Sequence, residues 1–231
     1  MAMTPPAHDG WKGRRTIAQG AEAVLEVGEF LGRPAVLKHR RPKGYRHPGL
    51  EAAIRASRTR TEARALRDAR AAGVRTPAVL DADPQEGRLV LERVEGPTVR
   101  ASLDGLPRAD RERVARGLGA TMGSLHAAGM VHGDPTTSNF ILERMDDEGP
   151  AGLAVLDISL GGRADGVEER GVDLRLLSEA FTSTHHVHGD LFDLVLDAYR
   201  DAFPQGAEEA MDRMEAIAAR GRYVSRKQRQ R

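Results

Sequence analysis

The pattern of apolar residues changes near residue 95, and this change constrains the fold more than any other feature of the chain. Before it, short apolar runs are separated by glycines, which is typical of strands joined by tight turns. After it, apolar residues recur at helical spacing over long segments. One helical segment, residues 47–74, interrupts the first part, with Pro48 suited to its start and Gly73 to its end. The order predicts a small β-rich lobe followed by a larger helical lobe with a cleft between them.

Within this outline, we expect paired strands at 21–27 and 33–39 and two further strands within 76–94. Residues 96–107 are interpreted as a linker, and 108–129 as an amphipathic helix. Residues 139–142 and 153–160 are expected to form a hairpin, and helices follow over 188–203 and 207–220. The helix at 108–129 is expected to bury the stripe formed by Val114, Leu118, Met122 and Leu125.

Composition excludes several classes of function. The 231 residues contain no cysteine, so disulfides, thiolate nucleophiles and cysteine-ligated metals are excluded. No apolar run approaches the roughly 18 residues of a membrane-spanning helix. The first ten residues lack the basic start and apolar stretch of a secretory signal. We therefore expect a cytoplasmic protein with no membrane association.

Net charge is only +1, but basic residues are concentrated in two places. Residues 38–47 contain five Lys or Arg and no acid, and the last twelve residues contain six Lys or Arg and no acid. Both stretches are compatible with an ordinary solvated surface and with a surface that faces a polyanion.

The stretch HGDPTTSNFIL, residues 132–142, carries the strongest chemical signal. Asp134 and Asn139 lie five residues apart on a loop between the long helix and a strand, and Asp157 ends the next strand. Asn139 and Asp157 are oxygen ligands of the kind that Mg²⁺ prefers, and Asp134 is placed to accept a proton from, or orient, an attacking hydroxyl or water. Singly, these residues fit a turn, a cap and a strand end. Together and in this order, they favour phosphoryl transfer.

The first lobe offers matching groups for nucleotide binding. Lys38 ends an apolar run and Glu62 lies in the helix that follows, the arrangement with which protein kinases orient phosphates. Each residue alone also fits an exposed position. The turn before the second strand has one glycine where a kinase loop has three, and Glu92 and Val94 have the position of an adenine-binding hinge, although an ordinary strand also explains them. The ATP-binding candidates in that turn are Gln19, Gly20, Ala21, Glu22 and Ala23.

Two histidine-containing features are assigned structural roles. His132, before Gly133 and Asp134, is expected to fix the loop rather than to catalyse. The cluster THHVH, residues 184–188, has no evident carboxylate partner along the sequence and is interpreted as a loop between helices rather than a metal site.

These segments resemble a protein-kinase-fold phosphotransferase, and specifically the small atypical serine/threonine protein kinases of the KEOPS/EKC complex, of the archaeal type. The matching segments are QGAEA, LKHRRPKGYRHPGLEAAIRASRTRTEARAL, GVRTPAVL, HGDPTTSNFIL, GVDLRLLSEAFTSTH and the RGR before the tail. The resemblance covers nearly the whole chain. It implies a bilobal α+β protein-kinase-like fold with a nucleotide-binding lobe at 1–94, a reduced, mostly helical catalytic lobe at 95–221 and a basic tail at 222–231.

The resemblance also implies roles for individual residues. Asp134 matches the catalytic aspartate, Asn139 and Asp157 the metal ligands, and Lys38 and Glu62 the ATP lysine and its partner. Asp173 matches an aspartate that braces the catalytic loop, although an acid in the first turns of a helix also explains it. The tail residues matched to tRNA or partner binding are Arg222, Arg226, Lys227, Arg229 and Arg231.

At the level of function, the resemblance implies ATP with Mg²⁺ or Mn²⁺, serine/threonine kinase activity with autophosphorylation, and ATPase activity within a complex that makes threonylcarbamoyladenosine on tRNA. The implied partners are a metal-dependent threonylcarbamoyltransferase subunit, the other KEOPS subunits, and tRNA through the complex. Two departures stand out: the usual D-F-G reads DIS at 157–159, and Pro135 follows Asp134.

Two other functions remain open from the sequence. A small-molecule kinase of the aminoglycoside or choline type uses a similar loop, but only fifteen residues separate Asp157 from Asp173, which leaves little room for a substrate-binding insert. A non-catalytic tRNA- or protein-binding scaffold is disfavoured because the set of Lys38, Glu62, Asp134, Asn139 and Asp157 is complete.

Overall fold

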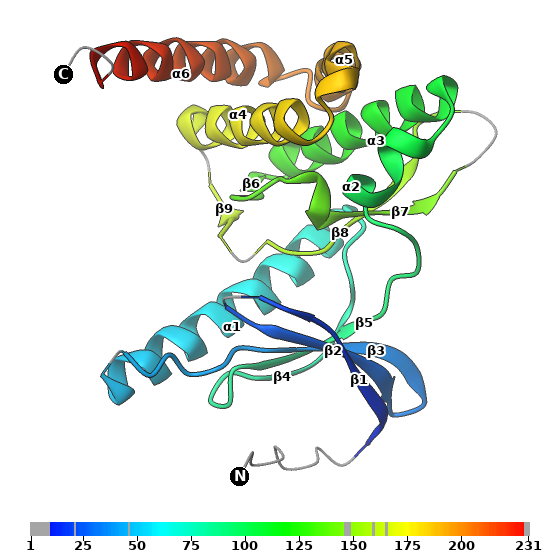
Figure 1. Ribbon diagram of the computed structural model, residues 1–231, viewed down its shortest axis with the longest axis vertical. Coiled ribbons are helices and arrows are strands. Elements are labelled where there is room, and N and C mark those ends of the chain that lie inside the picture. The colour runs from blue at the N-terminus through cyan, green and yellow to red at the C-terminus, as the bar shows by residue number, and fades with distance from the viewer. Residues whose placement is uncertain are drawn as a thin grey trace. The chain divides into compact units, whose positions relative to one another are not determined.

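The structure, a computed structural model, describes residues 10–20, 22–45, 47–145, 149–158, 160–164 and 166–228 (Figure 1), with side chains described up to residue 220. The chain divides into two compact units. The first comprises the described residues of Met1–Arg67 and Pro77–Arg93, and the second those of Asp68–Thr76 and Val94–Arg231.

The first unit contains a five-stranded antiparallel sheet in the order β1-β2-β3-β5-β4. Its strands are β1 (Trp11–Gln19), β2 (Val24–Phe30), β3 (Arg33–His39), β4 (Val79–Asp83) and β5 (Arg88–Glu92). β2 and β3 form the expected hairpin, although β2 extends to Phe30 rather than ending at residue 27. The tight turn at Leu31 and Gly32 has positive φ at both residues. Phe30, Ala35, Leu37 and Val90 form a core cluster on the sheet. The prediction of a β-rich first lobe is confirmed.

Helix α1 (Pro48–Ala71) begins at the proline that the sequence indicated. It ends where expected, because Gly73 adopts φ +90° and the amide of Val74 then donates to the carbonyl of Ala69 at 3.0 Å. Such a left-handed cap suits glycine, which has no Cβ to clash. The helix buries a stripe of residues spaced three or four apart, which includes Glu62. A glutamate is therefore placed on the inward face.

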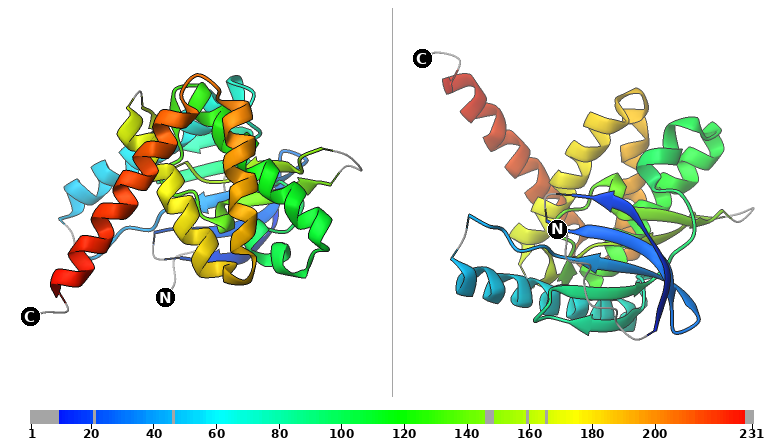
Figure 2. Two further views of the ribbon diagram at one scale, coloured as in Figure 1. Left: turned by 90° about the horizontal axis from the view of Figure 1, so that it is seen from above. Right: turned by 60° about the horizontal axis from the view of Figure 1, so that its bottom comes forward.

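The second unit is mainly helical, as expected. Its helices are α2 (Val99–Ser102), η1 (Leu103–Gly105), α3 (Arg108–Ala127), η2 (Thr137–Asn139), α4 (Val167–Thr184), η3 (His186–Leu191), α5 (Phe192–Ala202) and α6 (Ala207–Gln228). α3 packs against α5, and α4 packs against α6, as the view from above in Figure 2 shows. The predicted stripe on α3 is confirmed, since Val114, Leu118, Met122 and Leu125 are all fully buried.

The predicted linker at 96–107 is wrong in part, because the short helices α2 and η1 lie within it. The Thr98 hydroxyl accepts from the amide of Ala101 at 3.2 Å and so caps α2. The segment is also tied to β7, because the amide of Leu142 donates to the carbonyl of Pro97 at 2.9 Å. A four-residue helix has too short a pattern to be recognised by periodicity.

The close packing of α3 on α5 depends on Gly123. A Cβ at this position would lie 2.6 Å from the Cβ of Ala202 and 2.9 Å from the carbonyl oxygen of Tyr199. Alanine there would push the helices apart. The approach brings Tyr199 of α5 to His126 of α3, a contact that matters for the site.

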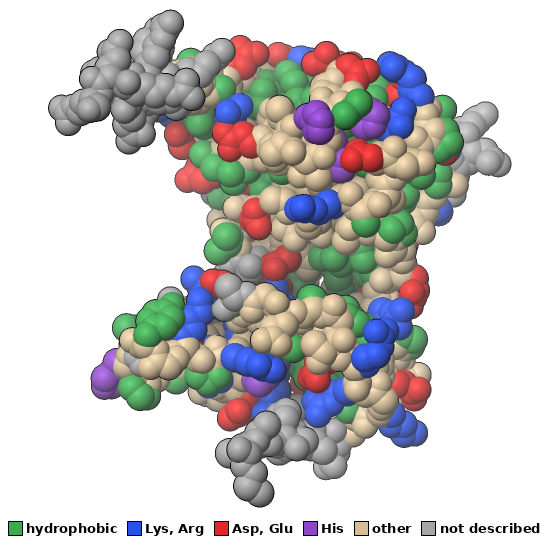
Figure 3. Space-filling view, in the orientation of Figure 1, with side chains coloured by type: hydrophobic (Ala, Val, Ile, Leu, Met, Phe, Trp, Pro, Cys, Tyr) green, Lys and Arg blue, Asp and Glu red, His purple; other side chains and the backbone are tan. Residues whose placement is uncertain are grey.

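Two small two-stranded sheets complete the second unit. β7 (Phe140–Arg144) pairs with β8 (Gly152–Val155), which confirms the predicted hairpin, and β6 (Met130–Val131) pairs with β9 (Gly162–Arg163). The predicted extent of the second strand, 153–160, is wrong, because β8 ends at Val155 and Asp157 lies two residues beyond it. Figure 3 shows histidine side chains grouped on the surface of this unit and charges of both signs intermixed on both units. No helix among the described residues is long and apolar enough to cross a membrane.

Candidate active site

In the first unit, Lys38 and Glu62 form the ion pair that the sequence indicated. The Nζ atom of Lys38 on β3 lies 2.6 Å from Oε1 of Glu62 on α1. The Glu62 side chain is fully buried, and that of Lys38 is 12% exposed. A buried carboxylate at this distance fixes the direction of the lysine side chain.

Arg40 is a second cation on the same carboxylate, and sequence reasoning missed it. Its Nη2 donates to Oε2 of Glu62 at 2.5 Å, while its buried Nε and Nη1 have no hydrogen-bond partner. Arg40 directly follows β3, two residues after Lys38, and only the packing of α1 shows that both cations meet one carboxylate. Two cations share one carboxylate, and this excess of positive charge suits an anionic ligand.

The turn between β1 and β2 is closed by the amide of Gly20, which donates to the carbonyl of Ala23 at 2.9 Å. Gln19, the last residue of β1, precedes this turn, and Ala21 lies outside the described residues. Glu22 is exposed, and the hydrogen bond from Arg58 at 2.6 Å lowers the pKa of its carboxyl. The described part of this turn can therefore offer a ligand its backbone groups, whereas the Glu22 carboxylate is already paired with Arg58.

The two hinge candidates have different surroundings. Glu92, at the end of β5, accepts a hydrogen bond from the amide of Ala78 at 2.9 Å through its side chain, and its own amide donates to the carbonyl of Ala78 at 2.8 Å. Val94 is buried in a cluster with Ile141 and Ala154 of the second unit. The backbone groups of these residues remain the predicted adenine contacts.

In the second unit, Asp134, Asn139 and Asp157 come from neighbouring segments. The Nδ2 of Asn139 donates to the carbonyl oxygen of Asp134 at 2.8 Å and to its Oδ2 at 3.3 Å. The carbonyl oxygen of Asn139 accepts from the amide of Leu156 at 2.9 Å, which places Asn139 beside the chain that leads into Asp157. Asp134 itself is exposed.

This arrangement fits a divalent cation. Both donors of the Asn139 amide group belong to Nδ2, which Asp134 engages, so Oδ1 is the atom left for a metal. Asp157 supplies a carboxylate from the adjacent segment. Oxygen donors of this kind, completed by phosphate oxygens and water, are what Mg²⁺ binds.

Asp173 of α4 holds the start of the loop. Its buried carboxylate accepts from the amides of His132 and Gly133 at 2.5 and 2.8 Å. Gly133 has φ +82°, and a Cβ there would lie 2.5 Å from the carbonyl oxygen of Leu160. Glycine is therefore required both by the backbone and by the close approach of the segment after Asp157.

Asp173 also belongs to a buried hydrogen-bond network that the sequence did not reveal. The Nε2 of His126 on α3 lies 3.2 Å from Oδ2 of Asp173, and its Nδ1 lies 2.8 Å from the hydroxyl of Tyr199. Burial raises the pKa of Tyr199, so its phenol stays protonated and donates to Nδ1. The His126 Nε2–H then donates to Asp173. Three helices thus meet behind two loop amides.

His132 is buried beside the loop. Its Nδ1 accepts from the amide of Asp134 at 3.3 Å, and its ring lies 5.4 Å from that of Phe140. Burial lowers the pKa of this imidazole, which is therefore neutral near pH 7. These contacts give it a place in the support of the loop.

The basic tail is described only in part. Helix α6 contains Arg222, Arg226 and Lys227, whose side chains the structure does not describe. Arg229 and Arg231 lie outside the described residues altogether.

The fold is that of the protein-kinase-like proteins. The Rio2 kinase of Chaetomium thermophilum, in its ADP/Mg²⁺-phosphoaspartate complex, matches with a TM-score of 0.63 over 91% of this chain and 71% of that one, at 17% identity. WaaP in complex with acyl carrier protein matches with a TM-score of 0.61 over 91% of this chain and 89% of that one, at 18% identity. No family model matches the chain.

The sequence comparison is more specific. The chain is 38% identical to the EKC/KEOPS complex subunit BUD32 of Gibberella zeae and covers 88% of it, and 37% identical to the KEOPS complex subunit Bud32 of Pyrococcus abyssi and covers 97% of it. These alignments span 97% and 92% of the present chain. The chain belongs to the Bud32 family of KEOPS complex subunits.

A further relative is longer. The "Probable bifunctional tRNA threonylcarbamoyladenosine biosynthesis protein" of Methanothermobacter thermautotrophicus is 38% identical over 209 residues, 90% of the present chain, but the chain spans only 36% of its length.

Proposed function

We propose that the protein is a Mg²⁺-dependent ATP phosphotransferase and ATPase that acts as the kinase subunit of a KEOPS complex. The observation that carries the proposal is the pair of contacts from the Asn139 amide to Asp134, beside the segment that leads to Asp157. A turn needs none of these polar groups in this combination. Phosphoryl transfer needs a base or orienting carboxylate and two oxygen ligands for a cation.

In the proposed mechanism, the groups divide between nucleotide binding and catalysis. Lys38, oriented by Glu62, binds phosphate oxygens, and Arg40 adds positive charge beside it. Asn139 and Asp157 would hold Mg²⁺, which would supply positive charge beside the phosphate oxygens. Asp134 orients a hydroxyl or water and accepts its proton. Asp173 keeps the loop amides, and hence Asp134, in place.

Membership of the Bud32 family supports the biological setting. The names of the relatives place those proteins in KEOPS complexes and in threonylcarbamoyladenosine biosynthesis. We propose that this chain likewise binds a metal-dependent threonylcarbamoyltransferase subunit and supports modification of tRNA. Affinity capture from source cells, with identification of bound proteins and RNA, tests this setting. Recovery of neither a transferase subunit nor tRNA would argue against it.

Both protein phosphorylation and ATP hydrolysis are compatible with this site. The segment 157–173 is short and does not end in an A-P-E motif, with which peptide-binding kinases close their activation segment. We therefore propose that autophosphorylation or partner-stimulated ATP hydrolysis dominates over phosphorylation of free peptides. A kcat/KM of about 10⁴ M⁻¹s⁻¹ or above on an isolated peptide would overturn this preference.

Calorimetric titration with Mg-ATP tests the assignment of the metal ligand. Asp157→Ala should weaken Mg-ATP binding, whereas Asp134→Ala should largely preserve it, because Asp157 is the one of these two carboxylates that is proposed to hold the cation. Asp197→Ala, which removes an exposed carboxylate of α5, is the control. Unchanged Mg-ATP affinity in Asp157→Ala would count against the metal assignment.

A further inference from the structure

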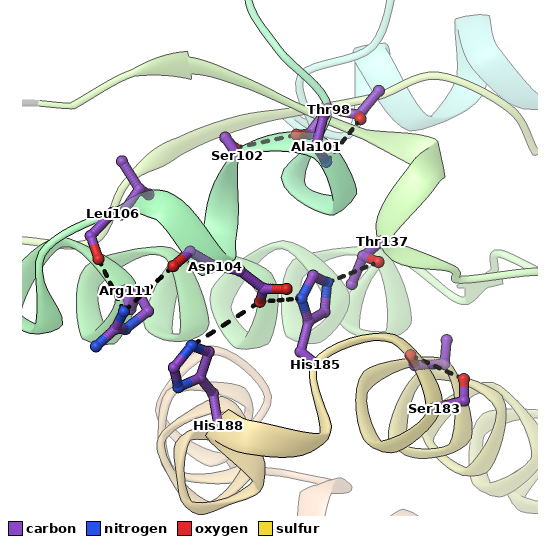
Figure 4. A network of polar contacts seen from close by, with 11 residues as sticks. Thr98, Ala101, Ser102, Asp104, Leu106, Arg111, Thr137, Ser183, His185 and His188 are labelled. Carbon is purple, nitrogen blue, oxygen red and sulfur yellow. Dashed lines mark hydrogen bonds and ion pairs between the residues drawn. The ribbon is translucent and has the colours of Figure 1, made fainter.

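A second polar network reaches the catalytic loop at its far end from Asp173. His185, directly after α4, lies with its Nδ1 2.6 Å from Oδ1 of Asp104 and its Nε2 3.2 Å from Oγ1 of Thr137 (Figure 4). Asp173 binds the amides of residues 132 and 133, whereas His185 binds a side chain of the loop at residue 137. The expectation that the 184–188 cluster has no carboxylate partner is therefore wrong, since Asp104 is that partner.

The chemistry of the three groups fixes the direction of their hydrogen bonds. A carboxylate only accepts, so the proton of the imidazole lies on Nδ1 and points to Asp104. The Nε2 atom then accepts the hydroxyl proton of Thr137. The order Asp–His–Thr resembles that of a hydrolase triad. Thr137 is only 1% exposed, however, so its hydroxyl has no access to a substrate, and a nucleophilic role is excluded.

The histidine and the aspartate of the network are both anchored. The His185 ring is buried and lies 5.4 Å from the ring of Phe181, and the His185 amide donates to the carbonyl of Phe181 at 2.7 Å. The turn that carries Asp104 is held by Arg111 of α3, which donates to the carbonyl of Leu106 at 2.9 Å. The network therefore links the loop to α4 and, through the turn that carries Asp104, to α3.

A metal site is the other function that two histidines and a carboxylate suggest, because His188 also lies 3.9 Å from Asp104. Within the part of the chain that the structure describes, no group of three or more His, Asp or Glu side chains is arranged to hold a metal ion. The short contact between His185 and Asp104 is instead a hydrogen bond. The network is thus built to hold Thr137.

We propose that His185 is a positioning residue that orients Asn139 and Asp134 through Thr137, and this rests on the proposed function. Thr137 is the first residue of η2 and Asn139 is its last. Asn139 in turn donates to Asp134. The hydrogen bond to the Thr137 hydroxyl fixes the turn η2 and so the orientation of the Asn139 and Asp134 side chains. The loop is thus held at one end by Asp173 and at the other by His185.

The test compares His185→Phe and Thr137→Val with His186→Phe. Phenylalanine keeps the ring that packs on Phe181, and valine is nearly the shape of threonine. His186 is the exposed neighbour of His185. Amide hydrogen exchange over residues 134–139 is measured together with kcat for ATP turnover in the complex and with ATP affinity in the absence of Mg²⁺.

We expect faster exchange over 134–139 and a loss of kcat of about 10- to 100-fold in both test variants, as for residues that support a metal ligand from behind. ATP affinity without Mg²⁺ should stay unchanged, and the double variant should lose no more kcat than the worse single variant. The His186→Phe control should match the wild type in every measurement.

Unchanged exchange over 134–139 in Thr137→Val and His185→Phe, or losses that multiply in the double variant, would overturn the positioning role. Thr137→Val decides the question if His185→Phe fails to fold. If no variant and no wild-type complex turns over ATP, the proposed function fails, while the exchange measurement still decides whether His185 orders the loop.

Discussion

Replacing Asp173 by asparagine should both destabilise the protein and slow phosphoryl transfer. The Asp173 carboxylate accepts three hydrogen bonds, from the amides of His132 and Gly133 and from Nε2 of His126. An asparagine side chain has one oxygen to accept them and an NH₂ group that can only donate. At least one of the three N–H groups then faces another donor inside the protein.

The size of the effect follows from burial. Asp173 is 1% exposed, so water cannot replace a lost partner. A hydrogen bond to a charged group contributes about 1.5–3 kcal/mol, and an unsatisfied buried donor costs about 1–3 kcal/mol more. The variant should therefore lose about 3–5 kcal/mol of unfolding free energy. At about 2–4 °C per kcal/mol for a chain of this size, Tm should fall by about 6–20 °C.

Thermal unfolding followed by circular dichroism measures this change, with Asp197→Asn as the control. Asp197 is an exposed aspartate whose side chain meets Arg200 at 3.1 Å, and such pairs contribute about 1 kcal/mol or less. A loss of about 1 kcal/mol lowers Tm by about 2–4 °C in a chain of this size. If the Tm values of Asp173→Asn and Asp197→Asn differ by less than about 2 °C, Asp173 does not support the loop as described.

Three other expectations follow from the same structure. Glu62→Gln leaves two buried cations without their carboxylate and should lower the free energy of unfolding in urea by about 3–5 kcal/mol. The exposed control Glu208→Gln should lower it by less than about 1 kcal/mol. Equal losses in the two variants would contradict the buried ion pair. Because burial lowers the pKa of His132, the unfolded chain takes up the proton first as pH falls below about 6.5. The free energy of unfolding should drop there by up to about 1.4 kcal/mol per pH unit. The drop should be less steep in His132→Phe, and identical slopes in wild type and variant would refute this reasoning. Deleting residues 222–231 should preserve Mg-ATP binding but weaken tRNA binding by the complex and flatten its dependence on salt, because fewer released counterions are involved; superimposable salt series would leave the tail as a solubilising end.

The sequence predicted those features whose signal is local. Pro48 and Gly73 bounded α1 correctly, because a fixed φ and a positive φ are properties of single residues. The spacing of apolar residues located α3 and the β7–β8 hairpin. The Lys38–Glu62 contact was expected because a lysine at a strand end and a glutamate in the following helix are the arrangement that protein kinases use.

Features that depend on distant parts of the chain were not predictable. Arg40 reads as one of several basic surface residues, and only the packing of α1 reveals that it is buried against Glu62. Asp104 and His185 are 81 residues apart, and no pattern along the chain connects them. The strands β6 and β9 have two residues each, too few for an alternating pattern.

The central claim is that Asp134 acts on the reacting group while other residues bind the nucleotide. Single-turnover transfer of the γ-phosphoryl group from saturating Mg-ATP, measured by rapid quench in the assembled complex, tests it most directly in wild type and Asp134→Asn. The account predicts transfer slower by about a hundredfold or more in the variant, with Mg-ATP affinity unchanged. Equal rates of transfer in the two proteins would contradict it.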